Sequence, residues 1–188
     1  MKLRLSYSFL LQWHNGRYQD ALDMYFHKPM VRSHQMEDGI KYHKQWEDTI
    51  LDKGKLTIGK TEFTFENPIC EEYFKVDYNE QFELSGKIDC RDAMWANSII
   101  YDWKSGKMGS LDYAGSYQMG MYFLILELAK LPVDQGILAH WNQYNNTADI
   151  TIVWNTKREV DKARNAIDTL GSEIYEYFID NKLSFDKP

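Results

Sequence analysis

Apolar and polar residues repeat with two different periods along the chain, and each period predicts a different element. Helical spacing of apolar residues runs over residues 6–27 and again over residues 36–51. Pro29 follows the first segment and Gly54 the second, and both residue types end helices. We therefore expect one helix in each segment.

Strand-like runs follow these two segments. Short stretches rich in β-branched and aromatic residues are separated by the turn-prone pairs GK, NP and NE. Such runs are typical of half-buried strands. They predict an antiparallel meander with strands at residues 56–58, 61–65, 72–78, 82–90 and 98–103.

The remainder of the chain mixes both periods and completes the expected architecture. It predicts two helices, two strands around the polar turn NQYNNT, and no internal repeat or linker, with the elements at residues 113–130, 135–141, 150–154 and 157–179. This order predicts the α/β (α+β) class, with a central mixed β-sheet flanked by helices. We expect a single domain over residues 1–188.

Composition and charge narrow the possible functions. The chain has 188 residues, 44% of them hydrophobic, which is enough for one buried core. No apolar run approaches the roughly 20 residues of a membrane helix, so we expect a cytoplasmic protein with no membrane partner. A net charge of -6 argues against binding nucleic acid by bulk electrostatics, because phosphate contacts need Lys and Arg. DNA contacts must then come from local clusters of Lys and Arg.

The two cysteines, Cys70 and Cys90, do not form a recognisable framework. A zinc ribbon or a set of disulfides needs more cysteines at closer spacing. We interpret both as reduced thiols.

The chemically richest segment is GKIDCRDAMWANSIIYDWKSGK. It places Asp89 on one predicted strand and Asp102 and Lys104 on the next. Side chains alternate along a strand, so Asp102 and Lys104 share one face and Trp103 points to the other. Lys87, Asp89 and Arg91 also share a face by this rule, and two carboxylates and an amine converge if the two faces coincide.

Two neighbouring carboxylates repel each other unless a cation neutralises them. Mg²⁺ and Mn²⁺ take oxygen ligands and keep positions open for water and phosphate. Such a site suits phosphodiester hydrolysis, with the ammonium of Lys104 orienting the water or offsetting charge in the transition state. The hypothesis is therefore a metal-dependent catalytic centre at Asp89, Asp102 and Lys104.

An Asp-x-Lys triplet is weak evidence alone, because it arises roughly once in a chain of this size. A second triplet, with Asp180 and Lys182, lies at the end of the last predicted helix, with no apolar strand before it. We interpret this second triplet as accidental.

Three ordered motifs together resemble the RecB-like exonuclease branch of the PD-(D/E)XK nuclease superfamily. GKID, then IIYDWKSGK, then SYQMGMYF in a helix are similar to that branch's G-x-x-D, D-x-K-x-G and Q-x-x-x-Y. The resemblance implies a restriction-endonuclease-like core. It also implies that Gln118 and Tyr122, four residues apart on one helical face, contact the nucleic acid.

Further members of the site follow from the same resemblance. GIKYH is similar to a helical G-x-x-x-H, which implies that His43 joins the metal shell. The backbone carbonyl of Trp103 is expected to contact the metal, and Glu71 or Glu72 is expected to take the place of a glutamate on an earlier strand. SYSFLLQWH is similar to the branch's S-x-S-x-L-x-x-[FW] start, through Ser6, Ser8, Leu10 and Trp13. Taken alone, His43 would be read as an ordinary helix residue.

Some relatives hold an iron-sulfur cluster through four cysteines, most of them near the C-terminus. Because this chain has no cysteine after Cys90, we expect no iron-sulfur cluster. The last helix must then be held by packing of Ile167, Leu170, Ile174 and Phe178.

The sequence thus predicts a DNA nuclease that uses Mg²⁺ or Mn²⁺, with an exonuclease acting on ends or single strands favoured over other modes, in recombination, repair or replication. The alternative is a non-catalytic nucleic-acid-binding module on a degenerate nuclease fold; a structural domain without metal or DNA is a third reading. Because the net charge is negative, the basic groove that binds DNA must come from clustered lysines, from homo-oligomerisation or from a recombination partner protein.

Overall fold

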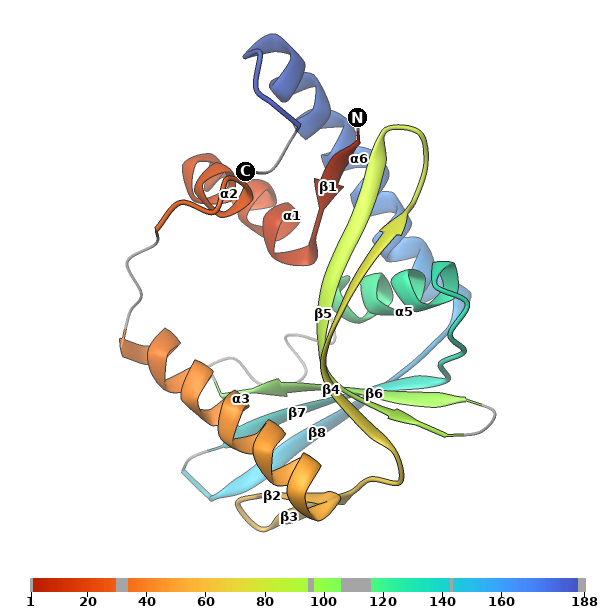
Figure 1. Ribbon diagram of the computed structural model, residues 1–188. Helices are drawn as coiled ribbons and strands as arrows, with labels where there is room; N and C mark the ends of the chain where they lie inside the picture. The colour runs from red at the N-terminus through yellow and green to blue at the C-terminus, as the bar shows by residue number, and fades with distance from the viewer. Residues whose placement is uncertain (1, 30–33, 95–96, 106–115, 143, 186–188) are drawn as a thin grey trace.

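A mixed β-sheet forms the centre of the computed structural model, which describes residues 2–29, 34–94, 97–105, 116–142 and 144–185 (Figure 1). Its path runs β1-β5-β6-β7-β8, with β4 paired on β5. The strands are β1 (Leu3–Leu5), β4 (Pro68–Asp77), β5 (Phe82–Ala93), β6 (Ser98–Lys104), β7 (Gln135–Asn142) and β8 (Thr147–Trp154). The predicted mixed sheet flanked by helices is confirmed.

Both pairing senses occur in this sheet. β5 pairs antiparallel with β4 and β6, and β7 pairs antiparallel with β8. β1 runs parallel to β5, and β6 runs parallel to β7. The parallel pair β6–β7 needs a crossover, which contains the helix α5 (Gln118–Leu128). The crossover places the start of α5 near the end of β6 that carries Asp102 and Lys104.

The first two predicted strands of the meander do not join this sheet. Among the described strands, β2 (Lys55–Ile58) and β3 (Thr61–Thr64) pair with each other and with no third strand. Their apolar residues Leu56, Ile58 and Phe63 pack instead with Trp103 in a second core. The prediction of one continuous meander was wrong because this hairpin covers a face of the sheet rather than extending an edge.

The N-terminal helical segment is also divided. The structure has α1 (Tyr7–His14) and α2 (Tyr18–Tyr25) where the spacing predicts one helix. Gly16 adopts a φ of 72°, a left-handed conformation that ends helices. The N–H of Gly16 and the N–H of Arg17 close the end of α1 by bonding to Trp13 and Gln12 carbonyls.

The remaining helices cover the two faces of the sheet (Figure 1). α5 and α6 (Lys157–Asp180) pack in one core with α1 and α2, while α3 (His34–Lys53) packs with β2 and β3 in the other. In α6 the expected packing residues Ile167, Ile174 and Phe178 are fully buried, and Leu170 is partly buried. Among the described helices, none is both long and apolar enough to cross a membrane.

α5 begins later than expected, at Gln118. Part of the predicted segment, residues 113–115, lies outside the described residues. The helix is buried on all sides from Gln118 to Leu126, as expected for a helix enclosed by a sheet and another helix. Its polar Gln118 therefore faces the protein interior and needs partners there.

The ribbon formed by β4 and β5 bends along its length (Figure 1), and its ladder is interrupted between the pairs Cys70–Cys90 and Glu72–Ile88. Ile88 belongs to the core beneath α5, whereas Cys90, two residues further on, belongs to the core beneath α3. On the paired strand, Glu71 interrupts the ladder with a φ of 56°, which is costly for a residue with a side chain. Cys70 and Cys90, both free thiols, are opposite each other beside this interruption.

Candidate active site

Two acids meet where β5 and β6 come together. The last paired residues of these strands are Cys90 and Tyr101, so Asp89 and Asp102 occupy the next positions on the two strands. Glu71 lies opposite Asp89 on β4, between the pairs Cys70–Cys90 and Glu72–Ile88. The bend in the sheet thus brings three acids into one row.

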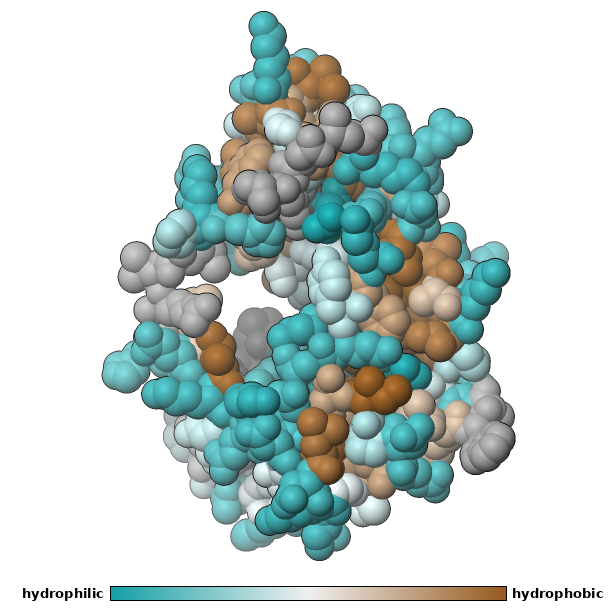
Figure 2. Space-filling model, in the orientation of Figure 1, coloured by the Kyte–Doolittle hydropathy of each residue, from teal (hydrophilic) through white to brown (hydrophobic). Residues whose placement is uncertain are grey.

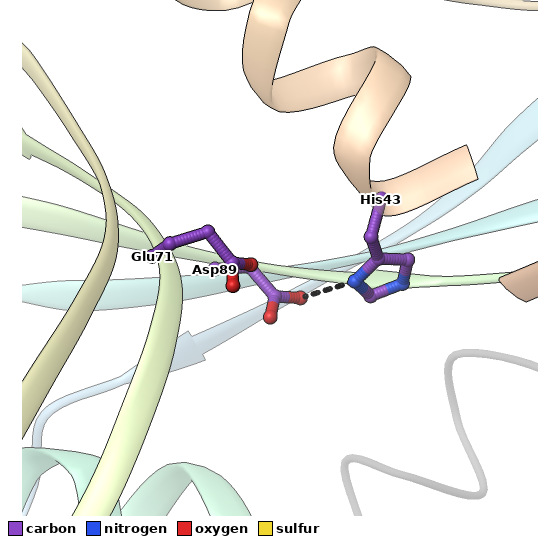
Figure 3. Close-up of side chains that lie close together, drawn as sticks. All are labelled: His43, Glu71 and Asp89. Atoms are coloured by element: carbon purple, nitrogen blue, oxygen red, sulfur yellow. Dashed lines mark ion pairs between the residues drawn. The ribbon is translucent and has the colours of Figure 1, made fainter. Parts of the chain in front are cut away.

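The first group of side chains consists of His43, Glu71 and Asp89 (Figure 3). One ligand atom from each lies within 4.8 Å of the other two. His43 comes from the middle of α3, and its Nδ1 is 3.6 Å from Oδ2 of Asp89. These groups come from a helix and two strands, so only the tertiary fold brings them together.

Burial has opposite effects on the two ionisable groups in contact here. It is the main cause that lowers the pKa of His43, and the charge of Lys104 adds to it. A neutral imidazole has a lone pair available for a metal. Burial, followed by repulsion from Asp102, raises the pKa of Asp89 to about 8. Asp89 thus lies in surroundings that favour either a proton or a cation.

Glu71 and Glu72 have different partners, which separates the two candidates. Glu72 accepts two hydrogen bonds from Arg91, at 2.8 and 3.1 Å. Glu71 instead lies beside His43 and Asp89, and its carboxylate forms an ion pair with Lys87. The geometry therefore favours Glu71 as the candidate ligand.

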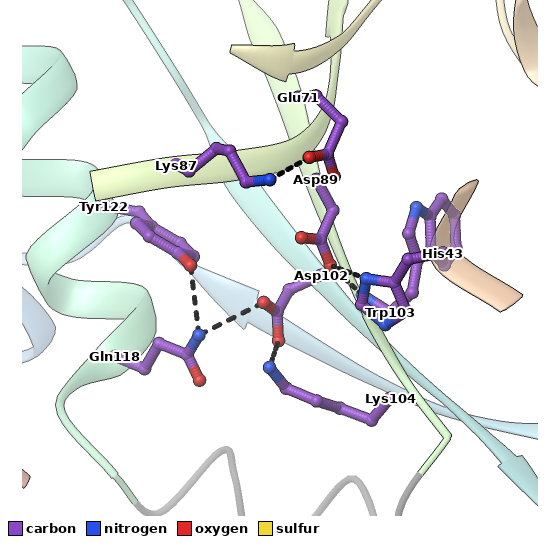
Figure 4. Close-up of polar contacts among 9 residues, drawn as sticks. All are labelled: His43, Glu71, Lys87, Asp89, Asp102, Trp103, Lys104, Gln118 and Tyr122. Carbon is purple, nitrogen blue, oxygen red and sulfur yellow. Dashed lines mark hydrogen bonds and ion pairs between the residues drawn. The ribbon is translucent and has the colours of Figure 1, made fainter. Parts of the chain in front are cut away.

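The second group consists of Asp102, Lys104, Gln118 and Tyr122 (Figure 4). Nζ of Lys104 is 2.6 Å from Oδ2 of Asp102. The amide of Gln118 donates to Oδ1 of Asp102 at 3.2 Å and lies 3.1 Å from the hydroxyl of Tyr122. Asp102 is only 2% exposed, so these contacts replace water around its charge.

Tyr122 is a neutral hydroxyl in this group. Burial raises its pKa well above the ordinary value, and the charge of Asp102 raises it further. Gly86 allows the approach of its ring, because a Cβ at Gly86 would lie 3.0 Å from Cδ1 of Ile125 and 3.4 Å from Cε1 of Tyr122. The glycine of GKID therefore makes room for α5 to pack against β5.

Trp103 connects the two groups through its backbone. Its N–H donates to Oδ2 of Asp89 at 2.9 Å, and a hydrogen bond with its backbone raises the pKa of His43 against the larger effect of burial. Its ring is 2% exposed and packs against Phe63 and Tyr101. The ring thus points away from Asp102 and Lys104, as strand alternation requires.

The donor set at the first group fits a divalent cation. It offers two carboxylates and one imidazole at mutually short distances. Carboxylates suit Mg²⁺ and Mn²⁺, and the imidazole suits Mn²⁺ better than Mg²⁺. The fold therefore presents a candidate metal site beside a buried Asp–Lys pair.

Other residues named in the sequence have structural places. Ser6 caps α1 by accepting from the N–H of Phe9, while Leu10 and Trp13 are buried in the core. Gly39 lies one turn before His43, and a Cβ there would be 3.3 Å from Oγ of Ser105. The sequence placed Lys87 on the same face as Asp89 without assigning it to the site, and the structure pairs it with Glu71.

The comparisons with known proteins agree with this geometry. A family model of the PD-(D/E)XK nuclease superfamily matches residues 11–183. The chain therefore belongs to the PD-(D/E)XK nuclease superfamily and is a phosphodiester hydrolase, which confirms the family predicted from the three motifs. A comparison with curated protein sequences finds no match.

Solved structures share the fold at low sequence identity. The alkaline exonuclease LHK-Exo from Laribacter hongkongensis gives a TM-score of 0.59 at 7% identity, over 95% of this chain and 93% of that one. Its complex with dAMP gives 0.54 at 7% identity, over 95% and 92%. SSO0001 gives 0.56 at 13% identity, over 90% and 76%. These similarities are consistent with the RecB-like exonuclease branch, and at such identities they show the fold alone.

Proposed function

We propose that the protein is a metal-dependent DNA exonuclease. The observation that carries this proposal is the adjacency of the two groups: a three-residue donor set at His43, Glu71 and Asp89 lies beside a buried Asp102–Lys104 pair. When bound, a divalent cation would act as a Lewis acid on the phosphate and lower the pKa of the attacking water. Asp102 and the Trp103 carbonyl complete the proposed surroundings of this cation.

The protein groups have separate proposed tasks. Asp102 holds the ammonium of Lys104 at 2.6 Å, where it orients the attacking water or offsets negative charge that develops on the phosphate. Gln118 and Tyr122 position the nucleic acid strand. The pKa of the Tyr122 hydroxyl is raised by burial, so this hydroxyl remains a hydrogen-bond donor in neutral solution.

Two features support a strand that enters beside α5. Near Tyr122 there is a pocket of about 250 Å³ lined also by Ser6, Ser8, Gly86 and Lys87. In the space-filling view an opening separates the surface over α1 and α2 from that over α3 (Figure 2). Exonuclease action is proposed because a neighbour is named an alkaline exonuclease and was solved with dAMP.

Positive charge on the described surface is largely neutralised by neighbouring acids. Lys41 pairs with Asp38, and Lys44 pairs with Glu47 and Asp48. A second subunit or a protein partner on DNA would provide the basic surface that strand binding needs. Recombination, repair and replication are the processes in which such an exonuclease would act.

The proposal is tested by cleavage of end-labelled DNA with Mg²⁺ or Mn²⁺ and with EDTA. We expect cleavage only with metal, with products released from an end, and its loss in Lys104→Ala. Lys182→Ala, in the unrelated Asp-x-Lys triplet at the end of α6, is the matched control and should cut like the wild type. Binding of DNA without cleavage under all conditions would instead identify a non-catalytic module.

A further inference from the structure

Two lysines are paired with acids of the site, and their surroundings differ (Figure 4). Lys104 is 17% exposed and its partner Asp102 is 2% exposed. Lys87 is 55% exposed and its partner Glu71 is 27% exposed. Lys104 is thus held in the interior, whereas the ammonium of Lys87 reaches Glu71 from solvent.

Glu71 has two competing uses. Its carboxylate belongs to the three-residue donor set with His43 and Asp89, and the same carboxylate forms the ion pair with Lys87. A divalent cation among these three residues would be close to the Lys87 ammonium, and like charges repel. Lys87 and the cation therefore compete for the carboxylate of Glu71.

The backbone holds Glu71 in place while the lysine remains free to move. Glu71 has a φ of 56° within a ten-residue strand, a conformation that persists only where the surroundings impose it. Lys87 has a long side chain that is more than half exposed, so it can turn toward water at little cost. The surroundings thus fix the backbone of Glu71, whereas the exposed side chain of Lys87 can leave.

We infer that Lys87 is a counter-ion that holds Glu71 ready in the metal-free protein and is displaced when a divalent cation binds. This inference rests on the proposed metal site. Lys87 is in this sense a positioning residue: it neutralises an acid of the site before the cation arrives, and it weakens cation binding by competition.

Removing the competitor must then tighten metal binding. We expect Lys87→Met to bind Mn²⁺ about twofold to fivefold more tightly than the wild type, which corresponds to the upper part of the range of about 0.2–1 kcal/mol for an exposed ion pair. Isothermal titration calorimetry with Mn²⁺ alone measures this effect without any cleavage assay. Lys75→Met is the matched control, because Lys75 also pairs across strands, with Glu83 at 3.0 Å, at 47% exposure.

A double-mutant cycle of Lys87→Met with Glu71→Gln tests whether Lys87 changes the Mn²⁺ affinity through Glu71. In the Glu71→Gln background there is no carboxylate left to compete for, so adding Lys87→Met should change the Mn²⁺ affinity less than it does in the wild type. Unchanged or weaker Mn²⁺ binding by Lys87→Met, with wild-type binding intact and an unchanged thermal unfolding curve, would overturn the inference alone. Absence of Mn²⁺ binding by the wild type would overturn the proposed metal site as well.

Discussion

Asp89 and Asp102 occupy neighbouring positions on adjacent strands, yet their surroundings are different. Asp102 contacts the ammonium of Lys104 and the amide of Gln118. Asp89 accepts one hydrogen bond from the backbone of Trp103, and burial raises its pKa to about 8. Asp102 therefore has a lysine as its counter-ion, which leaves Asp89 as the acid whose charge the proposed cation would chiefly neutralise.

The largest expected effect is on the rate of cleavage, and it separates the role of Asp89 from that of the Asp102–Lys104 pair. Lys104→Ala and Asp89→Asn should each slow cleavage by about 10³-fold, which is the cost of losing one electrostatic contact to a transition state. Only Asp89→Asn should also lose Mn²⁺ binding, because Lys104 is not a ligand. Single-turnover cleavage and calorimetry measure the two properties. Loss of metal binding in both variants would show that the two groups form one site without separate roles.

A substitution at His43 tests whether the helix α3 contributes a ligand to the proposed metal site around Asp89. His43→Ala should weaken Mn²⁺ binding by at least about the 10-fold to 100-fold that loss of a supporting partner costs. His34 lies on the same helix at 89% exposure, and His34→Ala serves as the control. Equal Mn²⁺ affinity in His43→Ala and His34→Ala would remove His43 from the proposed ligands.

The pH dependence of stability tests the surroundings of Asp89 in the metal-free protein. Its pKa rises from 3.8 to about 8 on folding, so between these values the folded state holds a proton that the unfolded chain has lost. The free energy of unfolding should therefore fall as the pH rises through this window.

Asp89→Asn provides the control, since its amide needs no proton. Urea unfolding at about pH 5 and about pH 8 gives the comparison. We expect the wild type to lose more stability between the two conditions than Asp89→Asn does. A fall of the same size in both proteins would mean that Asp89 is not the titrating group.

The smallest expected effect is on the free energy of unfolding, and it tests the hydrogen bonds around the buried Asp102. Gln118→Ala removes the amide between Asp102 and Tyr122, and should lower the free energy of unfolding by about 1–3 kcal/mol because buried polar groups lose a partner. Chemical denaturation measures the change, with Gln45→Ala on the exposed face of α3 as the control. A stability equal to that of the control would show that the network around Asp102 is not structural.

Local pattern predicted most elements of the fold and its central mixed sheet, but not every element or every strand pairing. Residues 157–179 were expected as a helix and α6 spans Lys157–Asp180, because long amphipathic periodicity is a strong signal. β1 was missed because three residues carry no period, and its place beside β5 is set by tertiary contacts. The division between α1 and α2 was missed because apolar spacing continues across Gly16.

The candidate site shows the same limit. Motif order was sufficient to name Asp89, Asp102, Lys104 and His43, whose roles remain predictions. The choice between Glu71 and Glu72 depends on a bend in the sheet and on the position of Arg91, and neither can be read from neighbouring residues. The partnership of Lys87 with Glu71 likewise requires the register of β4 on β5.

The most direct test of the account is the position of a bound cation. Crystals grown with Mn²⁺ should give an anomalous-difference peak between the side chains of His43, Glu71 and Asp89, with Lys104 still paired to Asp102. A peak elsewhere, or no peak at a Mn²⁺ concentration that supports cleavage, would contradict the assignment of these three residues as the metal site.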